Sequence, residues 1–321
     1  MLSRSAERLY WLARYLERTE NTARLLSVTM NLIYDLPYGS EVGWHNLLTI
    51  FSVEQAFNQR FKVANEQNIT RFLLTEDNPN SILSSLSYAR ENMRTSRELM
   101  PDEAWEQVNE LYLYAHKNKD SLSTRRGRVI FLQDIMRGCQ RFTGFMSNAM
   151  SHNDSYRFLC LGKNIERADM TTRIMDFGTV LLLAEDRSSI LREHEGLLWL
   201  NVLKSLSASL MYRKQVRLRI KGKDVLNFLL KDENLPSSVE HCLQEIAYCI
   251  KKLPNSAALL ITLNELEQAL FTVDMANTTP TQLHQLLDSL QNDFNQLHKH
   301  ISDTWFFNHQ VLDTETEVVT Q

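Results

Sequence analysis

The chain reads Arg14-Tyr15-Leu16-Glu17-Arg18-Thr19-Glu20 near its start, and Arg24 follows after three intervening residues. A related stretch begins 149 residues later with Lys163-Asn164-Ile165-Glu166-Arg167-Ala168-Asp169, and Arg173 follows it at the same spacing. Both copies place a basic residue, a Glu-Arg pair, an acidic residue and a final arginine at identical positions. This recurrence predicts a chain made of two related halves.

The duplication extends beyond the Glu-Arg motif. Four residues recur at one offset of 155 residues: Trp44, Asn46, Leu48 and Ser52 match Trp199, Asn201, Leu203 and Ser207. A Phe-Leu-Leu segment with the acidic turn after it, at 72–82, also resembles 228–239 with one inserted residue. A period this long is typical of a duplicated half-domain rather than of a solenoid of short repeats.

The composition and the apolar spacing indicate helices throughout. The chain of 321 residues is 43% hydrophobic and 23% charged, with only nine glycines and six prolines, as expected for a folded protein with long helices. Apolar residues recur at helical spacing, and no segment alternates as a strand does. Helices are expected near 3–34, 44–60, 83–99, 105–115, 130–142, 156–184, 199–220, 239–253, 257–272 and 280–301.

The sequence therefore predicts an all-α helical bundle built from two pseudo-repeated halves that share one core. We expect the first half at residues 1–150, the second at 151–305 and a flexible acidic tail at 306–321. The segment 75–80 is expected to be a polar turn with Ser81 as a helix cap, and 121–128 to be a basic turn around Gly127.

Bulk charge and hydropathy argue against several classes of protein. The net charge of −4 gives no reason to expect nucleic acid as a partner. No stretch approaches the roughly 18 apolar residues of a membrane span, and no secretory signal is visible. The four cysteines lack CxxC spacing, which favours reduced, buried thiols in a cytoplasmic protein.

The charged face of the first motif helix also carries apolar residues. At 100° per residue, Tyr10, Ala13 and Leu25 share the arc of the charged side chains, opposite the core arc of Leu9, Leu12, Leu16, Ala23 and Leu26. This mixture favours a face that another helix covers or that lines a cleft, with a solvated face as the alternative. It leaves two roles open: a helix-docking network across a pseudo-dyad, or a ligand or catalytic cleft.

Spacing suggests which charges can meet. Pairs three apart, Arg14 with Glu17 and Lys163 with Glu166, can interact within one helix, as can Glu20 with Arg24 and Asp169 with Arg173, four apart. Adjacent Glu17 and Arg18 point about 100° apart and should not pair. The Glu-Arg residues of each copy are then free to contact groups outside their own helix.

At these residues the chain resembles the alpha-E family, a bacterial all-helical domain named for its Glu-Arg motif. The resemblance is carried by 1–24, Asn78-Pro79-Asn80-Ser81-Ile82, Ala89-Arg90-Glu91-Asn92, 158–169 and 228–239. The chain departs from the family pattern at Lys163, where arginine is expected, and after Pro236, where a basic residue is usual. The resemblance implies a genomic association with circularly permuted ATP-grasp amide ligases and transglutaminase-like peptidases, which are thought to make or attach small peptides.

Two functions follow as expectations. The first is an accessory or partner subunit of an ATP-grasp amide ligase, which binds substrate or the ligase through its duplicated Glu-Arg cluster. The alternative is a stand-alone enzyme for a small peptide or amino-acid derivative, with Glu17 and Glu166 as general acid or base. The candidate ligand-binding or interface residues are Arg14, Glu17, Arg18, Arg24, Arg90, Glu91, Lys163, Glu166, Arg167, Asp169 and Arg173.

Motifs for other chemistries were not found. The chain lacks the Glu-x-x-His pairs of di-iron bundles, and no P-loop, GxSxG, GxGxxG or HExxH motif is present. We therefore expect no metal and no cofactor. The expected partners are a circularly permuted ATP-grasp protein, a transglutaminase-like protein, or a second copy of the chain in a homo-oligomer, with no nucleic acid and no membrane.

Overall fold

The computed structural model describes residues 3–37, 42–182, 192–216, 219–274 and 277–306. Every regular element in these residues is a helix, so the all-α prediction is confirmed. The α-helices are α1 (Ser3–Asp35), α2 (Asn46–Phe51), α3 (Glu54–Asn58), α4 (Glu66–Leu74), α5 (Ile82–Arg94), α6 (Asp102–Lys117), α7 (Arg125–Ala149), α8 (Asp154–Leu182), α10 (Glu195–Ser205), α11 (Ser209–Gln215), α12 (Gly222–Lys231), α13 (Val239–Ile250), α14 (Ala257–Phe271) and α15 (Pro280–Trp305).

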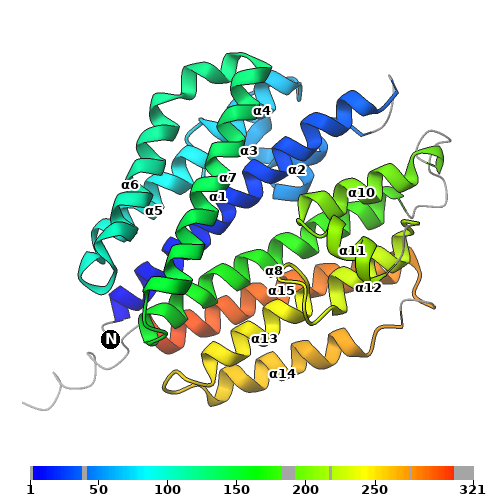
Figure 1. The fold of residues 1–321 in the computed structure, drawn as a ribbon. Helices are drawn as coiled ribbons and strands as arrows, with labels where there is room; N and C mark the ends of the chain where they lie inside the picture. The colour runs from blue at the N-terminus through cyan, green and yellow to red at the C-terminus, as the bar shows by residue number, and fades with distance from the viewer. Residues whose placement is uncertain (1–2, 38–41, 183–191, 217–218, 275–276, 307–321) are drawn as a thin grey trace, which may run out of the picture.

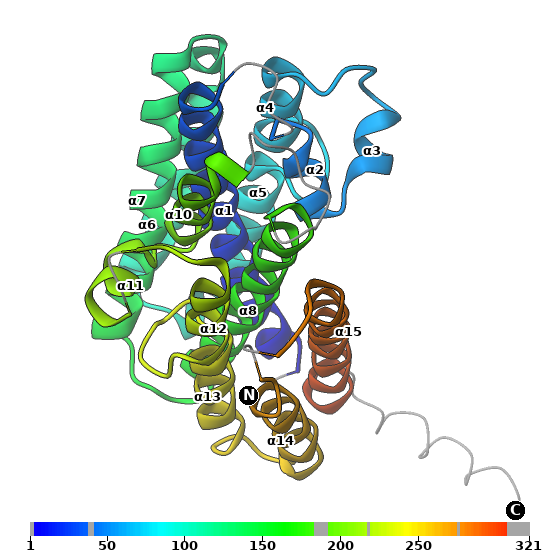
Figure 2. The same cartoon turned by 90° about the vertical axis from the view of Figure 1, so that its right-hand side faces the viewer.

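The two helices that carry the Glu-Arg motifs, α1 and α8, run side by side through the middle of the molecule (Figure 1). Helices α5 and α7 pack against α1, while α13 and α15 pack against α8. Figure 2 shows the same arrangement from the side, with α5 to α7 flanking α1 and α12 to α15 gathered beside α8. The short helices cross over, since α10 contacts α1 and α2 contacts α8.

A glycine sets how closely α1 and α8 approach each other. A Cβ atom placed on Gly162 would lie 2.1 Å from the carbonyl oxygen of Tyr10, which is far inside contact distance. The absence of a side chain at Gly162 therefore lets the α8 backbone touch the α1 backbone. The predicted core arc of α1 is confirmed, since its members Leu9, Leu12, Leu16, Ala23 and Leu26 are all buried.

Side-chain caps define the start of several helices. Ser81 accepts a hydrogen bond from the backbone N–H of Ser84 at the start of α5, as its position after the polar turn predicts. Ser238 accepts one from His241 at the start of α13 in the same way. Each cap satisfies a backbone donor that has no partner within its own helix.

The expected continuous helices at 44–60 and 199–220 are wrong. Each is broken by a serine in the left-handed region, Ser52 with φ 53° and Ser207 with φ 56°. These residues end α2 and follow α10, and the chain then turns into α3 or α11. The apolar spacing continues across both breaks, so hydrophobic periodicity alone did not reveal them.

Two features singled out in the sequence lie at least partly in helices: the two Phe-Leu-Leu segments and the stretch expected as a basic turn at 121–128. The Phe-Leu-Leu segments belong to helices, α4 and α12, which pack their apolar faces inward. The basic turn expected at 121–128 ends earlier, because α7 begins at Arg125. Gly127 lies in its first turn, where a Cβ would come within 1.9 Å of the Ser121 carbonyl oxygen.

The C-terminal end of α15 is anchored in the core. Trp305 donates its indole N–H to the carbonyl of Pro254 at 2.8 Å, and Phe306 is buried against Tyr10 and Phe158. The rest of the expected acidic tail, 307–321, lies outside the described residues.

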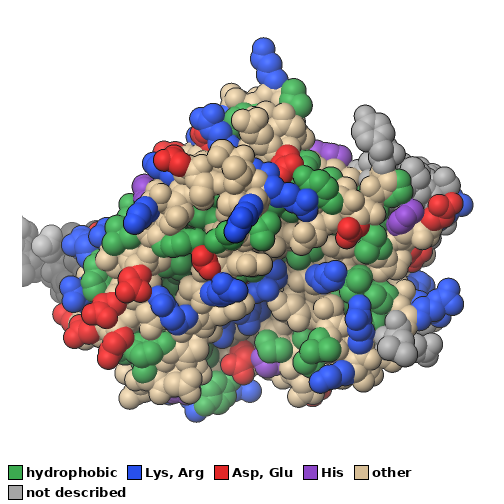
Figure 3. Space-filling view, turned by 45° about the horizontal axis from the view of Figure 1, so that its top comes forward, with side chains coloured by type: hydrophobic (Ala, Val, Ile, Leu, Met, Phe, Trp, Pro, Cys, Tyr) green, Lys and Arg blue, Asp and Glu red, His purple; other side chains and the backbone are tan. Residues whose placement is uncertain are grey.

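The structure can be compared with the expectations about the cysteines and about membrane-spanning helices. All four cysteines are buried free thiols. Among the described residues, no helix combines the length and the apolar character that crossing a membrane requires. On the face that Figure 3 shows, basic, acidic and hydrophobic side chains are interspersed.

Candidate functional site

The two Glu-Arg motifs pair with each other across the α1–α8 seam. Arg167 donates from Nε and Nη2 to the two carboxylate oxygens of Glu17, at 2.7 and 2.9 Å. Arg18 donates in the same two-pronged way to Glu166, at 2.6 and 3.1 Å. Paired parallel bonds of this kind are the strongest guanidinium–carboxylate geometry. We call Arg14, Glu17, Arg18, Glu166 and Arg167 the Glu-Arg clasp.

The basic residue that opens each motif behaves differently in the two copies. Arg14 was expected to pair with Glu17 on its own helix, but its Nε instead donates across the seam to Glu166 at 2.7 Å. Its guanidinium carbon lies 5.0 Å from the ring centre of Trp11, within range of a cation–π contact. In the described structure Lys163 forms no ion pair with Glu166, the other contact that the spacing within a helix allowed. Glu166 thus holds two arginines, and Glu17 holds one.

The clasp is buried, as the mixed apolar and charged arc favoured. The side chains of Glu17 and Glu166 are 4% and 3% exposed. Burial opposes ionisation of Glu166, but Arg18 and Arg14 outweigh it and hold its pKa at about 2. The carboxylate of Glu17 similarly raises the pKa of Arg167 against the effect of burial. Glu166 and Arg167 are therefore charged at neutral pH.

Each motif ends in a pair within its own helix, as the spacing predicts. Glu20 pairs with Arg24, and Asp169 with Arg173 at 2.9 Å. Glu20 also accepts a hydrogen bond from Gln140 on α7 at 2.9 Å. Burial and the neighbouring clasp carboxylate raise the pKa of Glu20.

A polar pocket of about 290 Å³ lies on the Arg167 side of the clasp. It is lined by Glu17, Glu20, Asn21, Arg24, Gln140, Arg167, Thr171, Ser205, Leu206, Ser207, Met211, Leu235, Pro236 and Ser237. We call it the clasp pocket. In the described part of the chain Arg24 bonds through Nη2 to Glu20, so the Nε–H and Nη1–H groups remain for a ligand.

The equivalent arginine of the other motif makes a different contact. There Arg173 donates from Nη1 to Ser52 Oγ at 2.9 Å. Arg24 makes no such bond to Ser207, and both instead line the clasp pocket. The two sides of the clasp therefore differ at one arginine–serine contact, and the clasp pocket has room for a small molecule or a partner's side chain.

The two candidates on α5 lie outside the clasp. Arg90 donates to Asn109 on α6 at 2.7 Å and lies over the ring of Tyr112. Glu91 is exposed and pairs with Arg94 on its own helix at 2.7 Å. The structure therefore does not bring Arg90 and Glu91 into the Glu-Arg clasp.

Sequence reasoning missed the residues that connect the clasp to α15. The hydroxyl of Tyr10 lies 2.9 Å from Nδ1 of His298, and the two rings stack. Burial and Arg14 lower the pKa of His298 to about 4, so the ring is neutral at pH 7. The histidine lies in a different helix from the motifs, and no repeat or spacing in the sequence connects it with them.

Comparison with known proteins places these observations in a family. No solved structure matches the chain. Two curated relatives, Uncharacterized protein Mb2597 of Mycobacterium bovis and Uncharacterized protein MT2643 of Mycobacterium tuberculosis, are each 21% identical over 270 residues. The match covers 78% of this chain but only 30% of each relative, so the chain spans less than a third of their length. A family model described as "a predicted alpha-helical domain with a conserved ER motif" matches residues 1–306, and the chain belongs to this Alpha-E family.

Proposed function

We propose that this protein is an accessory subunit of an ATP-grasp amide-ligase system. In this proposal the Glu-Arg clasp maintains the shape of the clasp pocket, and the pocket holds an amino acid or the end of a small peptide for the ligase. The observation that carries the proposal is the combination of fully paired clasp carboxylates with one neighbouring arginine, Arg24, that keeps unused donors.

The proposal includes an architecture of two pseudo-repeated halves, α1 to α7 and α8 to α15. The reciprocal pairs Glu17–Arg167 and Arg18–Glu166 support it, because exchanging the halves exchanges the two pairs. So do the left-handed Ser52 and Ser207, which lie at matching positions of the duplicated sequence. The clasp then lies on the pseudo-dyad, where each half stabilises the other.

The paired state of the clasp carboxylates favours a binding role over catalysis by these residues. A general acid or base near neutral pH needs a pKa close to the working pH and an accessible oxygen. Glu166 has a pKa of about 2, and both of its carboxylate oxygens accept hydrogen bonds from Arg14 and Arg18. The stand-alone enzyme with Glu17 and Glu166 as acid and base is therefore the less supported alternative.

The charges around the clasp pocket indicate the class of ligand. Two carboxylates, Glu17 and Glu20, balance two guanidinium groups, Arg24 and Arg167, so the pocket has no net charge from these four residues. A zwitterion suits this arrangement better than a multiply charged phosphate does. Its carboxylate would meet the open donors of Arg24, and its ammonium group would meet Glu20. The volume of about 290 Å³ is at the small end of ligand pockets, which suits an amino acid or a short peptide end.

The ligase partner comes from the family resemblance. The curated relatives support an alpha-helical unit that works beside other domains, because about 70% of each of their chains lies outside the match. A transglutaminase-like protein or a second copy of this chain would be a further partner in the same assembly.

The test is reconstitution with a circularly permuted ATP-grasp protein from the same organism. We expect the two proteins to copurify and the ligase to form product from ATP and a zwitterionic substrate only when this protein is present. Arg24→Gln should leave the complex intact but lower the rate at subsaturating substrate at least tenfold. Arg94→Gln, which changes an exposed arginine on α5, is the matched control and should have no effect.

Three results would contradict the proposal. The accessory role is wrong if the ligase alone reaches the full rate, or if this protein alone turns over the substrate. The assignment of the pocket is wrong if Arg24→Gln behaves like the Arg94→Gln control.

A further inference from the structure

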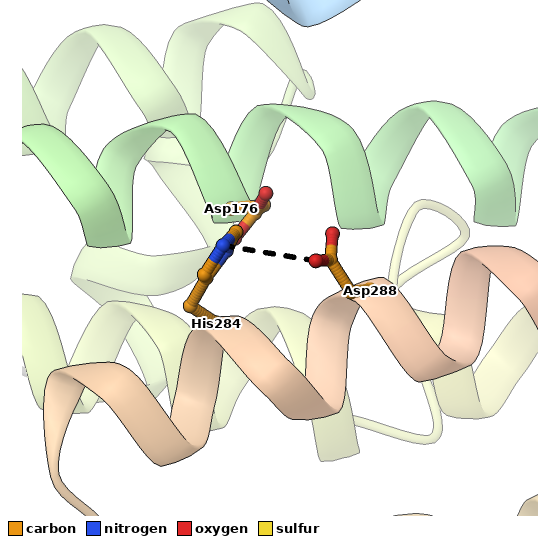
Figure 4. A group of neighbouring side chains, drawn as sticks. All are labelled: Asp176, His284 and Asp288. Carbon is orange, nitrogen blue, oxygen red and sulfur yellow. Dashed lines mark hydrogen bonds and ion pairs between the residues drawn. The ribbon is translucent and has the colours of Figure 1, made fainter.

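Three side chains with metal-binding groups meet between α8 and α15, away from the Glu-Arg clasp. Asp176 projects from α8, and His284 and Asp288 lie one turn apart on α15 (Figure 4). Their ligand atoms all lie within 4.8 Å of one another. The two carboxylates face different nitrogens of the same imidazole: Asp176 Oδ1 is 2.6 Å from Nδ1, and Asp288 Oδ2 is 3.7 Å from Nε2.

The contact between His284 and Asp176 fixes the orientation of the ring. At 2.6 Å it is a short hydrogen bond. The acceptor, Asp176, is partially buried, with 17% of its side chain exposed. A carboxylate that accepts the Nδ1–H of a histidine leaves Nε2 with its lone pair outward. This is the usual support for a histidine that binds a metal, since it sets the tautomer and makes the free nitrogen more basic.

The second contact has the wrong length for a hydrogen bond and nearly the right length for two ligands of one ion. Bonds of about 2.0–2.1 Å to a tetrahedral Zn²⁺ place neighbouring ligand atoms about 3.3 Å apart. The observed separation of 3.7 Å between His284 Nε2 and Asp288 Oδ2 exceeds this by a few tenths of an ångström. The side chain of Asp288 is 54% exposed and can rotate by that amount without disturbing the core.

The local charge also favours a cation. The three side chains carry two carboxylates and one imidazole, and no lysine or arginine of the described structure forms an ion pair with Asp176 or Asp288. A divalent ion supplies the positive charge that balances these two carboxylates.

We propose that Asp176, His284 and Asp288 form a site for a divalent transition-metal ion of the zinc type. His284 Nε2 and Asp288 Oδ2 bind the ion directly, Asp176 orients the imidazole through Nδ1–H, and water completes the coordination. Nitrogen and carboxylate oxygen are ordinary zinc ligands, and the spacing of four residues puts both direct ligands on one face of α15. This site is independent of the ligase partnership proposed above.

The experiment is a zinc titration of the full chain after removal of bound metal with a chelator. Competition with a chromophoric chelator should show one Zn²⁺ per chain. His284→Ala should abolish this binding, and Asp176→Asn should weaken it about 10–100-fold, the usual effect of losing the carboxylate that supports a metal-bound histidine. His300→Ala removes an exposed histidine of the same helix and should leave the affinity unchanged.

A Co²⁺ spectrum distinguishes this site from the four thiols of the chain. Nitrogen and oxygen ligands should give weak visible bands with no sulfur-to-cobalt charge-transfer band in the near ultraviolet. The proposal is overturned if the wild-type chain binds no Zn²⁺, if His284→Ala binds as tightly as wild type, or if a charge-transfer band appears and is retained in His284→Ala. The far-ultraviolet circular dichroism of each variant, together with the conservative Asp176→Asn, separates loss of the site from loss of the fold.

Discussion

Glu166 is the residue whose loss should disturb the clasp most. Its carboxylate accepts three hydrogen bonds from two guanidinium groups, Arg18 Nε and Nη2 and Arg14 Nε. Glu166→Gln keeps the shape of the side chain but removes the negative charge and turns an N–H₂ group towards a cation. Arg14 and Arg18, whose side chains are only 10% and 16% exposed, are then left without compensation.

The expected loss follows from that burial. Removing one partner of a buried ion pair costs about 3–5 kcal/mol, mainly because the remaining charge stays desolvated. We therefore expect Glu166→Gln to lower the free energy of unfolding by about 3–5 kcal/mol. Glu17→Gln strands only Arg167 and should have a smaller effect, near the lower end of that range.

Urea unfolding followed by circular dichroism at 222 nm measures this difference from the midpoint and the slope of the transition. Glu91→Gln is the matched control, because Glu91 pairs with Arg94 on an exposed helix surface, and its midpoint should stay at the wild-type value. Adding Arg18→Met to Glu166→Gln should recover at least about 1 kcal/mol, because one stranded charge disappears. A loss below about 1 kcal/mol for Glu166→Gln would refute the view that the clasp carboxylates are buried and fully paired.

Three further predictions concern the seam and the clasp. Gly162→Ala should destabilise the protein by about 1–3 kcal/mol in the same urea assay, because the new methyl group overlaps the backbone of α1. A variant as stable as wild type would show that α1 and α8 are further apart. Stability should fall on acidification: the unfolded chain protonates first at His298, between pH 6.5 and 4, and at Glu166, between pH 4.5 and 2. Protonation of Glu166 should account for a loss of about 3 kcal/mol in the free energy of unfolding. In urea midpoints measured at a series of pH values, His298→Asn should remove only the decrease between pH 6.5 and 4. Lys163→Arg should raise the free energy of unfolding by up to about 1 kcal/mol by offering Glu17 a second guanidinium group. A lowered free energy of unfolding would count against the equivalence of the two motifs.

Most of the fold class and the inner part of the site could be predicted from the sequence. Long helices dominate because apolar residues recur at helical spacing with few glycines, and α1 and α13 to α15 begin close to their expected positions. The charged residues of α1 were expected to be partly buried because Tyr10, Ala13 and Leu25 share their arc, and the structure places Glu17 and Arg14 in the interior.

The pairing partners could not be predicted, because spacing within a helix identifies neighbours only on that helix. Arg14 lies one turn from Glu17 and yet bonds to Glu166, since Gly162 brings α8 close enough for the long arginine side chain to cross. The separation of Arg90 and Glu91 from the clasp has the same origin, because the packing of α5 against α6 gives Arg90 the partner Asn109.

The breaks at Ser52 and Ser207 were missed for a different reason. Serine is uncommon in the left-handed region, and the apolar pattern runs through both positions without interruption. The cluster of Asp176, His284 and Asp288 had one signal in the sequence, the four-residue spacing of His284 and Asp288 on a helix. Its third member lies on a helix more than 100 residues away, so spacing alone could not complete it.

A double-mutant cycle on Glu17 and Arg167 tests the central claim, that each motif pairs with the other across the α1–α8 seam. The free energy of unfolding would be measured for wild type, Glu17→Gln, Arg167→Met and the double variant. Side chains joined by two hydrogen bonds at 2.7 and 2.9 Å with 4% of the carboxylate exposed should be coupled by about 1.5–3 kcal/mol. Additive effects, within about 0.5 kcal/mol, would show that Glu17 and Arg167 do not meet and would contradict the account.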